Sequence, residues 1–291
     1  KYYRSYWLAT DLRETNDYLL QVGQSVGLMY GYVTDGFYTV DDFQEGEGNW
    51  KLKPGVVNSQ GVTRSLGGSG GNPLVGSLKL KKLTPVDPNN PDSYNVTIDD
   101  RTVIGDANPI HTGGFSLSGN YKNIDLSVFF NWSYGNDVYN AQKIMNTTTW
   151  KYKYYNMSTL VDSQHRFSIY NAEGNDLRTD KEAMKAYNAN ASIWNPAMQS
   201  CVFHSWAVED GSFLRLSNIT LGYSLPTKWI KKAHISKARF YVTANNLHVW
   251  TKYSGFDPEV NTRRTTPLTP GVDYSAYPKA RSFTFGTNIT F

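Results

Sequence analysis

The sequence predicts an all-β fold, specifically an antiparallel segment of a transmembrane β-barrel with long extracellular loops. Three observations predict it: apolar and polar residues alternate along the final segment, a central hairpin has a register that matches its pattern, and long and short connections alternate. The 21 Tyr, 13 Phe, 8 Trp and 24 Gly among 291 residues suit strands and turns. Membrane strands need only about 9 to 11 residues with every second side chain apolar, so a mean hydropathy of −0.50 is compatible with them.

Period-two patterns predict six strands, all in a barrel wall. In chain order they lie near 25–40, 113–121, 124–134, 212–225, 237–253 and 281–291. In the first, Val26, Leu28, Tyr30 and Tyr32 are in phase, which indicates that one side of the strand faces an apolar medium.

The second and third strands form the most diagnostic pair. They flank the two-residue turn Lys122-Asn123. An antiparallel pairing sets Tyr121 opposite Ile124 and places apolar residues of both strands on one face, with Ser and Asn on the other and Phe129 as the one exception. Register and pattern therefore agree.

The next two strands enclose a short connection. The strand near 212–225 ends at Pro226, and residues 227–237 can form one helical turn. In the strand near 237–253 the apolar phase slips across Asn245-Asn246, which predicts a β-bulge or an exit from the apolar zone.

The last strand has the clearest alternation. Ser, Thr, Gly and Asn take its even positions. Its odd positions carry the residues that we expect to face lipid: Phe283, Phe285, Ile289 and Phe291.

The connections differ in length in a regular way. Residues 41–112, 135–211 and 254–280 form long connections rich in Gly, Pro, Asn, Asp and Ser, whereas 122–123 and 226–236 are short. If successive strands run up and down, all long connections lie at one end, as in outer-membrane barrels.

Composition argues against several other classes. The 29 basic and 25 acidic residues form no block of one sign, so nucleic acid is not an expected partner. A single cysteine, Cys201, rules out an internal disulfide framework and a multi-cysteine metal site. The chain starts at Lys1 without an initiator Met or an apolar signal segment, and we expect it to be a piece of a longer protein.

No catalytic pattern emerges from the sequence. The five histidines are scattered singly, no GxSxG turn is present, and no carboxylate pair stands out. We therefore expect no enzyme activity, no catalytic residue, no cofactor and no metal.

Several segments resemble the SusC-like family of TonB-dependent outer-membrane transporters of Bacteroidetes. The matching stretches occur in the same order as in the family and span nearly the whole chain. They are Val26 to Tyr38, Asp100 to Gly105, Gly113 to Asn140, Asp210 to Pro226, Phe240 to Val260 and Tyr277 to Phe291.

The resemblance implies the C-terminal portion of a barrel of about 22 strands whose plug domain is absent from this chain. It implies location in the outer membrane of a Gram-negative bacterium of the Bacteroidetes type. It also implies TonB-dependent uptake of oligosaccharides with a SusD-like surface lipoprotein, a TonB complex acting on the plug, and a dimer of transporter–lipoprotein pairs. Phe291 resembles the terminal residue that the barrel-assembly machinery recognises.

One stretch departs from the family pattern. Many relatives carry an Asp-x-Asn-x-Asp-Gly segment before the DRTVIG residues, which resembles a calcium loop. Residues 83–100 lack that spacing and its glycine. We expect no metal there.

Aromatic residues in the long connections are the candidates for substrate contact, because aromatic faces stack on sugar rings. They are also typical of membrane-interface belts and of protein interfaces. The candidates are Trp150, Tyr152, Tyr154, Tyr155, Trp194 and Trp206.

Two alternatives remain at this stage. The same transporter class also imports oligopeptides, and no residue distinguishes the two substrates. A soluble β-sandwich that binds glycans through Trp and Tyr is the second alternative, and it predicts a protein that stays monodisperse without detergent.

Overall fold

The computed structural model describes residues 2–4, 17–44, 50–149, 156–199, 202–262 and 267–291. Its main element is a five-stranded antiparallel sheet, here called the long sheet, with the strand order β14-β12-β11-β8-β7. The strands are β7 (His111–Tyr121), β8 (Ile124–Tyr134), β11 (Phe213–Ser224), β12 (Lys237–Thr251) and β14 (Ser282–Thr290). Each strand pairs with the next long strand along the chain, so the sheet is a meander.

The predicted hairpin is confirmed in its register, and its first strand begins two residues before the predicted 113, at His111. Tyr121 lies opposite Ile124, and Phe115 lies opposite Phe130. Lys122 has a φ of 55°, which fits the positive φ that two-residue hairpin turns require. The alternation of apolar and polar residues and the turn geometry therefore select the same pairing.

The β-bulge predicted at Asn245-Asn246 is confirmed, but the predicted slip of the apolar phase on β12 is wrong: Val249 pairs with Arg215 of the polar face and Trp250 with Leu214 of the apolar face. The pairing of β11 with β12 runs from Asn218↔Asn245 to Leu216↔His248, so one extra residue lies on β12. Asn246 has a φ of 52° at this bulge. Because β11 also bulges against β8 at the same level, the apolar face takes odd positions of β11 from Ile219 onward but even positions at Leu214 and Leu216.

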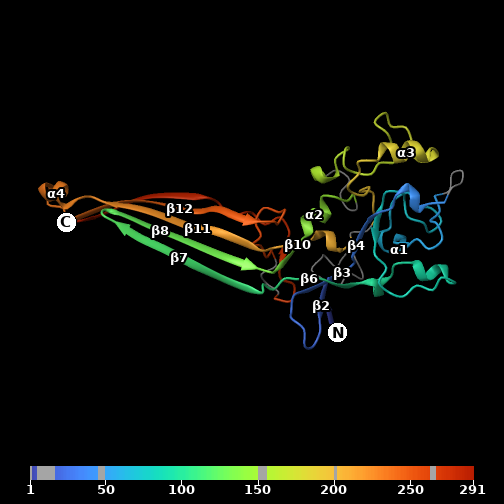
Figure 1. The fold of residues 1–291 in the computed structure, drawn as a ribbon, viewed down its shortest axis with the longest axis horizontal. Helices are drawn as coiled ribbons and strands as arrows, with labels where there is room; N and C mark the ends of the chain where they lie inside the picture. The colour runs from blue at the N-terminus through green and yellow to red at the C-terminus, as the bar shows by residue number, and fades with distance from the viewer. Residues whose placement is uncertain (1, 5–16, 45–49, 150–155, 200–201, 263–266) are drawn as a thin grey trace.

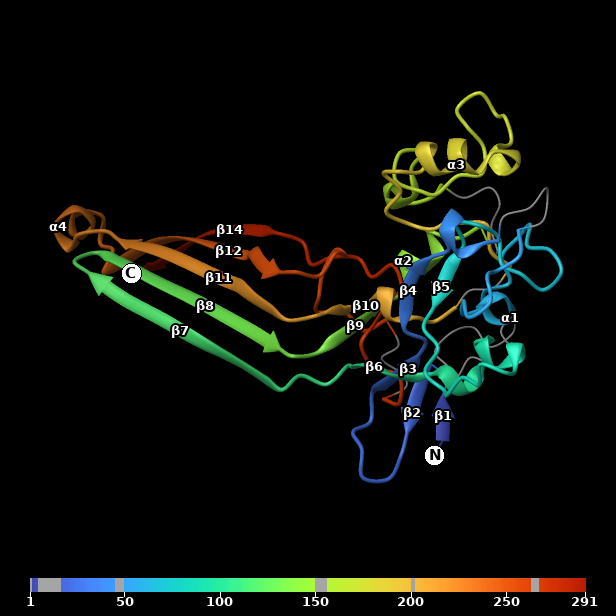
Figure 2. The same ribbon diagram turned by 45° about the vertical axis from the view of Figure 1, so that its right-hand side comes forward.

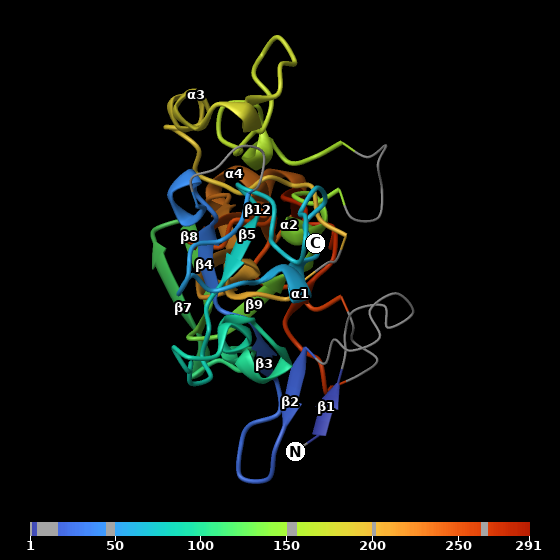
Figure 3. The same cartoon turned by 90° about the vertical axis from the view of Figure 1, so that its right-hand side faces the viewer.

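The two ends of the long sheet differ, as Figures 1 and 2 show. Its short connections, the turn at 122–123 and helix α4 (Thr227–Ile230), lie at one end together with the last residues of the chain. The long connections gather at the other end and fold into a separate mass, here called the loop body, seen end-on in Figure 3.

The described residues of the loop body form three small sheets. They are β1 (Tyr2–Arg4), β2 (Tyr18–Leu20), β3 (Leu28–Gly31) and β6 (Thr102–Asp106); β4 (Thr34–Phe37) and β5 (Leu78–Leu80); and β10 (Val208–Asp210), β9 (Asp137–Asn140) and β13 (Val272–Asp273). The pairing of β13 with β9 is parallel.

Short helices complete the elements. The α-helices of the loop body are α1 (Gln60–Thr63), α2 (Ala141–Met145) and α3 (Lys181–Tyr187). The 3₁₀ helices are η1 (Val40–Asp42), η2 (Pro91–Tyr94), η3 (Ile98–Asp100), η4 (Thr159–Val161), η5 (Leu177–Thr179), η6 (Ser205–Ala207) and, next to α4, η7 (Lys231–Ala233).

The structure corrects the strand predicted at 25–40. This range contains β3 and β4, which lie in two different sheets of the loop body and not in the long sheet. The reason is a close packing contact: Gly31 lies so near the Phe203 carbonyl that a Cβ would not fit, and the Tyr32 amide donates to that carbonyl at 3.1 Å. Of the alternating apolar residues in this range, Leu28 is buried, Tyr30 and Tyr32 are half-buried, and Val26 is exposed.

The long connections are packed structures and not open loops. Three clusters of buried side chains hold them, one around Tyr18, Met29 and Tyr139, one around Leu78 and Trp194, and one around Tyr38 and Phe43. These clusters join segments far apart in the sequence, so the loop body has its own hydrophobic core.

Candidate functional site: the two faces of the long sheet

One face of the long sheet is apolar across all five strands. Residues paired directly across an antiparallel ladder point to the same side, so the register assigns each side chain to a face. The apolar face carries Phe115, Leu117 and Tyr121 of β7; Ile124, Leu126, Val128, Phe130 and Trp132 of β8; Leu214, Leu216, Ile219, Leu221 and Tyr223 of β11; Phe240, Val242, Ala244 and Trp250 of β12; and Phe283, Phe285 and Ile289 of β14.

This face is exposed. Leu117 is 60% exposed and Phe285 is 81% exposed, although both belong to residue types that a folded protein normally covers. A contiguous apolar patch that runs over five strands exceeds what a soluble monomer leaves in water. The face therefore needs an apolar medium or a partner.

Aromatic residues are concentrated at both ends of the apolar face. Near the loop body, the His111 ring stacks on Tyr134 at 5.1 Å, and Trp132 donates its indole N–H to His111 Nδ1 at 3.0 Å. At the opposite end lie Tyr121 and Tyr223. Aliphatic residues and phenylalanines fill the rows between these two aromatic zones.

The opposite face is polar and joined by hydrogen bonds between strands. Thr220 and Thr243 hydroxyls lie 2.9 Å apart, and Asn218 donates to Asn245 Oδ1 at 2.7 Å. Asn245 in turn donates to Ser282 Oγ at 3.1 Å. Such cross-strand pairs stabilise the register from the polar side.

An ion pair crosses an entire strand on this polar face. Arg239 of β12 donates from Nε to Asp125 Oδ1 of β8 at 2.8 Å and passes over Gly222 of β11. A Cβ at position 222 would collide with both partners. The Tyr241 ring covers Gly286 in the same way, and the Arg239 guanidinium lies 5.0 Å from that ring. The two glycines are therefore required by their neighbours' side chains.

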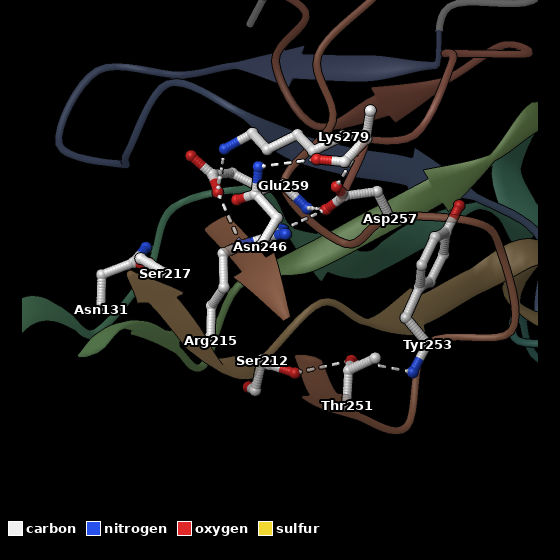
Figure 4. Close-up of polar contacts among 11 residues, drawn as sticks. Asn131, Ser212, Arg215, Ser217, Asn246, Thr251, Tyr253, Asp257, Glu259 and Lys279 are labelled. Atoms are coloured by element: carbon white, nitrogen blue, oxygen red, sulfur yellow. Dashed lines mark hydrogen bonds and ion pairs between the residues drawn. The ribbon is translucent and has the colours of Figure 1, made fainter. Parts of the chain in front are cut away.

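A buried ion pair fastens the loop body to the long sheet (Figure 4). Arg215 of β11 is 3% exposed, and its Nη2 donates to Asp257 Oδ1 at 2.5 Å. Glu259 lies 3.4 Å from Arg215 Nε and accepts from Lys279 Nζ at 2.6 Å. This network ties the connection after β12 to β11, and removal of one partner would leave a buried charge without its counter-ion.

Trp194 and Trp206 belong to one aromatic cluster inside the loop body. Their rings lie 4.8 Å apart, and His204 stacks on Trp206. Trp194 is 3% exposed, so almost none of its ring is available to a ligand, whereas Trp206 is partly exposed and carries Lys143 Nζ 4.1 Å from its ring. Trp150, Tyr152, Tyr154 and Tyr155 lie outside the described residues.

His204 is enclosed in this cluster and uncharged. Its Nδ1 lies 2.7 Å from Thr34 Oγ1, and complete burial together with the charge of Lys143 lowers its pKa to about 3. Lys143 also pairs with Glu209 at 3.0 Å, and Glu209 accepts from the Ser254 hydroxyl at 2.8 Å. The cluster thus couples four segments of the loop body.

The Asp100 carboxylate joins the two ends of the stretch 83–100. Asp100 accepts from Lys82 Nζ at 2.8 Å and from the Thr84 and Thr97 amides, both at 2.8 Å. Burial raises the pKa of Asp100, but these hydrogen bonds outweigh it and hold that pKa well below the ordinary range. Protein donors therefore occupy the carboxylate.

The four residues predicted to face lipid lie at the edge of the long sheet or just beyond its last strand. Phe283, Phe285 and Ile289 share the apolar face, and Phe291 is 86% exposed. Within the described part of the chain, no three His, Cys, Asp or Glu side chains gather to hold a metal, and no helix there is long and apolar enough to cross a membrane.

The sequence patterns did not identify Arg215, Asp257, Asp125 or Arg239. A usable signal existed for two of them, because Asp125 and Arg215 are the single charged residues of β8 and β11 and lie in the polar phase of those strands. Their partners could not be found in this way, since 42 residues separate Arg215 from Asp257 and 114 separate Asp125 from Arg239.

The chain is similar in sequence to proteins of known class. It is 30% identical over 277 residues to TonB-dependent receptor P3 of Formosa agariphila, a match that covers 94% of this chain and 23% of that protein. TonB-dependent receptor SusC of Bacteroides thetaiotaomicron is 28% identical over 153 residues, covering 50% of this chain and 14% of SusC. The chain spans 23% and 26% of the two relatives that match it over most of its length. No family model matches.

Solved structures share the fold. The RagAB peptide importer in its open-open state has a TM-score of 0.61 at 20% identity, covering 94% of this chain and 23% of the importer chain. The closed-closed state gives a TM-score of 0.57 at 21% identity and covers 94% of this chain and 25% of that chain. The all-β fold predicted from the sequence, an antiparallel barrel segment, is confirmed.

We predict that Gly222→Val disrupts the polar face. The new side chain would displace Arg239 from Asp125, and overpacking of this kind costs about 1 to 3 kcal/mol. Thermal unfolding of the purified protein should show a lower midpoint. Gly119→Val is the control, since no atom lies within 4 Å of a Cβ there. Equal effects of the two substitutions would contradict the role of Gly222.

We predict that the loop body loses stability as pH falls. The pKa of His204 is lowered in the folded state, so the unfolded chain binds the proton more readily, and stability is lost below the ordinary histidine pKa near 6.5. Linkage gives a loss of about 2 kcal/mol between pH 7 and pH 5. Hydrogen exchange in residues 202–208 at both pH values measures it. His204→Gln should remove most of the pH dependence, and an unchanged profile would argue against this assignment.

Proposed function

Because this chain is homologous to part of the SusC-like TonB-dependent receptors, we propose that it forms wall and outer mouth of an outer-membrane nutrient importer. The single observation that carries this proposal is the division of the long sheet into an exposed apolar face and a hydrogen-bonded polar face. In a barrel, the first contacts lipid and the second lines the lumen.

The dimensions of the apolar face support the membrane assignment. Between Trp132 and Ile124, a rise of roughly 3.4 Å per residue along strands tilted by about 40° gives a height of roughly 20 Å. Outer-membrane barrels carry an apolar band of about 25 Å between two aromatic girdles. The aromatic residues at the two ends of this face match those girdles.

The different lengths of the connections at the two ends of the long sheet support its orientation in the membrane. Outer-membrane barrels have short periplasmic turns and long extracellular loops, so the loop body would lie outside the cell and α4 in the periplasm. The proposed location is therefore the outer membrane of a Gram-negative bacterium of the Bacteroidetes type.

The proposed substrate is an oligosaccharide, received from a SusD-like lipoprotein that caps the loop body. In this scheme a plug domain fills the barrel, the TonB complex supplies the force, and two transporter–lipoprotein pairs form a dimer. Trp206 is the described candidate for sugar contact because part of its ring is exposed. The undescribed aromatics at 150–155 remain candidates with it.

An oligopeptide is the second candidate substrate. It is favoured by the fold similarity to RagAB, which is described as a peptide importer. Growth on oligosaccharides or on oligopeptides as the limiting nutrient distinguishes the two. It is compared between a strain that lacks the gene and the same strain with the gene restored. Loss of growth on neither class would contradict the import function.

We predict that a charge on the apolar face impairs membrane folding. Phe283 lies in the middle row of that face, and Arg near the membrane midplane costs about 2 to 4 kcal/mol. Phe283→Arg should lower the yield of heat-modifiable, folded protein in the outer membrane. Thr284→Arg, the next residue on the polar face, is the matched control. Equal yields from the two variants would contradict the lipid-facing assignment.

A further inference from the structure

The short-connection end of the long sheet is strongly basic. Five exposed lysines lie there and, in the β11–β12 connection from 225 to 238, the sequence contains no Asp or Glu. The lysines are Lys122, Lys228, Lys231, Lys232 and Lys237.

Hydrogen bonds bring these segments together. The Ser224 amide donates to the Asn123 carbonyl at 2.8 Å, so the β7–β8 turn adjoins the end of β11. The Ser236 amide donates to the Thr290 carbonyl at 2.8 Å, which places the start of β12 beside the end of β14. Figures 1 and 2 show α4 at this tip, so the backbone brings all five lysines to one end of the sheet.

One carboxylate close to this tip, that of Asp125, is already paired with Arg239, although the charge of Lys237 also acts on it. Asp125 lies three residues beyond Lys122 in the chain but is engaged by Arg239 on the polar face. The lysines themselves have no ion pair among the described residues. Their charges are therefore available to a partner.

The same tip also presents aromatic rings. Trp229 of α4 is 67% exposed while its neighbour Ile230 is buried and holds the helix in place. Tyr121 is 70% exposed at the adjoining end of the apolar face, with Lys122 Nζ 5.3 Å from its ring. Exposed Trp and Tyr beside lysines at the edge of an apolar band are typical of side chains in the headgroup region of a bilayer.

We propose that the α4–η7 connection, with the β7–β8 turn, is a binding surface for anionic phospholipid headgroups. The lysines pair with lipid phosphates, and Trp229 inserts at the boundary between headgroups and acyl chains. This inference rests on the proposed membrane orientation, which places the tip at the inner leaflet. Each lysine near an anionic surface strengthens binding roughly fivefold. Replacement of several lysines at once should therefore weaken lipid binding by a large factor.

The test uses the full-length receptor in nanodiscs of phosphatidylcholine, with or without phosphatidylglycerol. Native mass spectrometry counts the lipids that stay bound. The fluorescence of Trp229 is the part of the emission that is missing in Trp229→Phe, and we expect brominated phosphatidylglycerol to quench it. We expect wild type to retain phosphatidylglycerol at least about tenfold better than a variant with Lys228, Lys231, Lys232 and Lys237 changed to Gln. The difference should shrink in high salt, because salt screens exposed charges.

A matched control changes four exposed lysines of the loop body to Gln, and it should retain phosphatidylglycerol as wild type does. These are Lys51, Lys53, Lys81 and Lys252.

The outcomes separate this inference from the proposed function. Equal retention by wild type and the tip variant, with normal incorporation into nanodiscs, overturns the lipid surface and leaves the membrane assignment intact. Quenching of Trp229 by acrylamide but not by brominated phosphatidylglycerol also overturns it, since the tip would then face water or a protein. Failure of wild type to enter nanodiscs at all contradicts the proposed function itself.

Discussion

The constraint on which this structure depends is the period of two in a β-strand, which gives all five strands a common apolar face, with one change of phase at the bulge in β11. An exposed Leu or Phe costs about 1.5 to 3 kcal/mol relative to a buried one, and this sheet exposes a whole face of them. No element of the described chain covers that face. The sheet is therefore stable only where the surroundings are apolar, and every other feature follows from how the strands are held in register.

The polar face maintains that register. The hydrogen bonds of Thr220, Asn218 and Asn245 run across the strands, and the pair of Asp125 with Arg239 spans β11 because Gly222 leaves space for it. Directly after Asn245, the bulge at Asn246 shifts the backbone of β12 without reversing its two faces. Slippage by one residue would place these polar groups in the apolar medium.

The loop body depends on a different kind of contact. Buried ion pairs and aromatic clusters join segments that are distant in the chain, as Arg215 with Asp257 and His204 with Thr34 show. Such pairs require complementary charges and hydrogen bonds, since an isolated buried charge is costly. This explains how long connections rich in glycine and proline form the compact loop body with a fixed attachment to the long sheet.

The sequence was sufficient for the features that depend on local pattern. The hairpin register, the bulge and the two faces all follow from alternation and turn chemistry, which are local. The strand expected at 25–40 failed because alternating residues also suit a buried core strand, and only the distant Phe203 decides between the two. The burial of Trp194 could not be predicted for the same reason. Its ring contacts His204 and Trp206, which are not adjacent to it in the sequence.

The central claim is that neighbouring residues of one strand face lipid and lumen in turn. Spin labels placed one at a time along β11 of the full-length receptor in nanodiscs test it, with accessibility to oxygen and to a water-soluble nickel complex measured at each position. The account predicts that labels at 219, 221 and 223 are accessible to oxygen, while labels at 218, 220 and 224 are not and respond to the nickel complex where the lumen is wet. Equal access of nickel to both sets would contradict it.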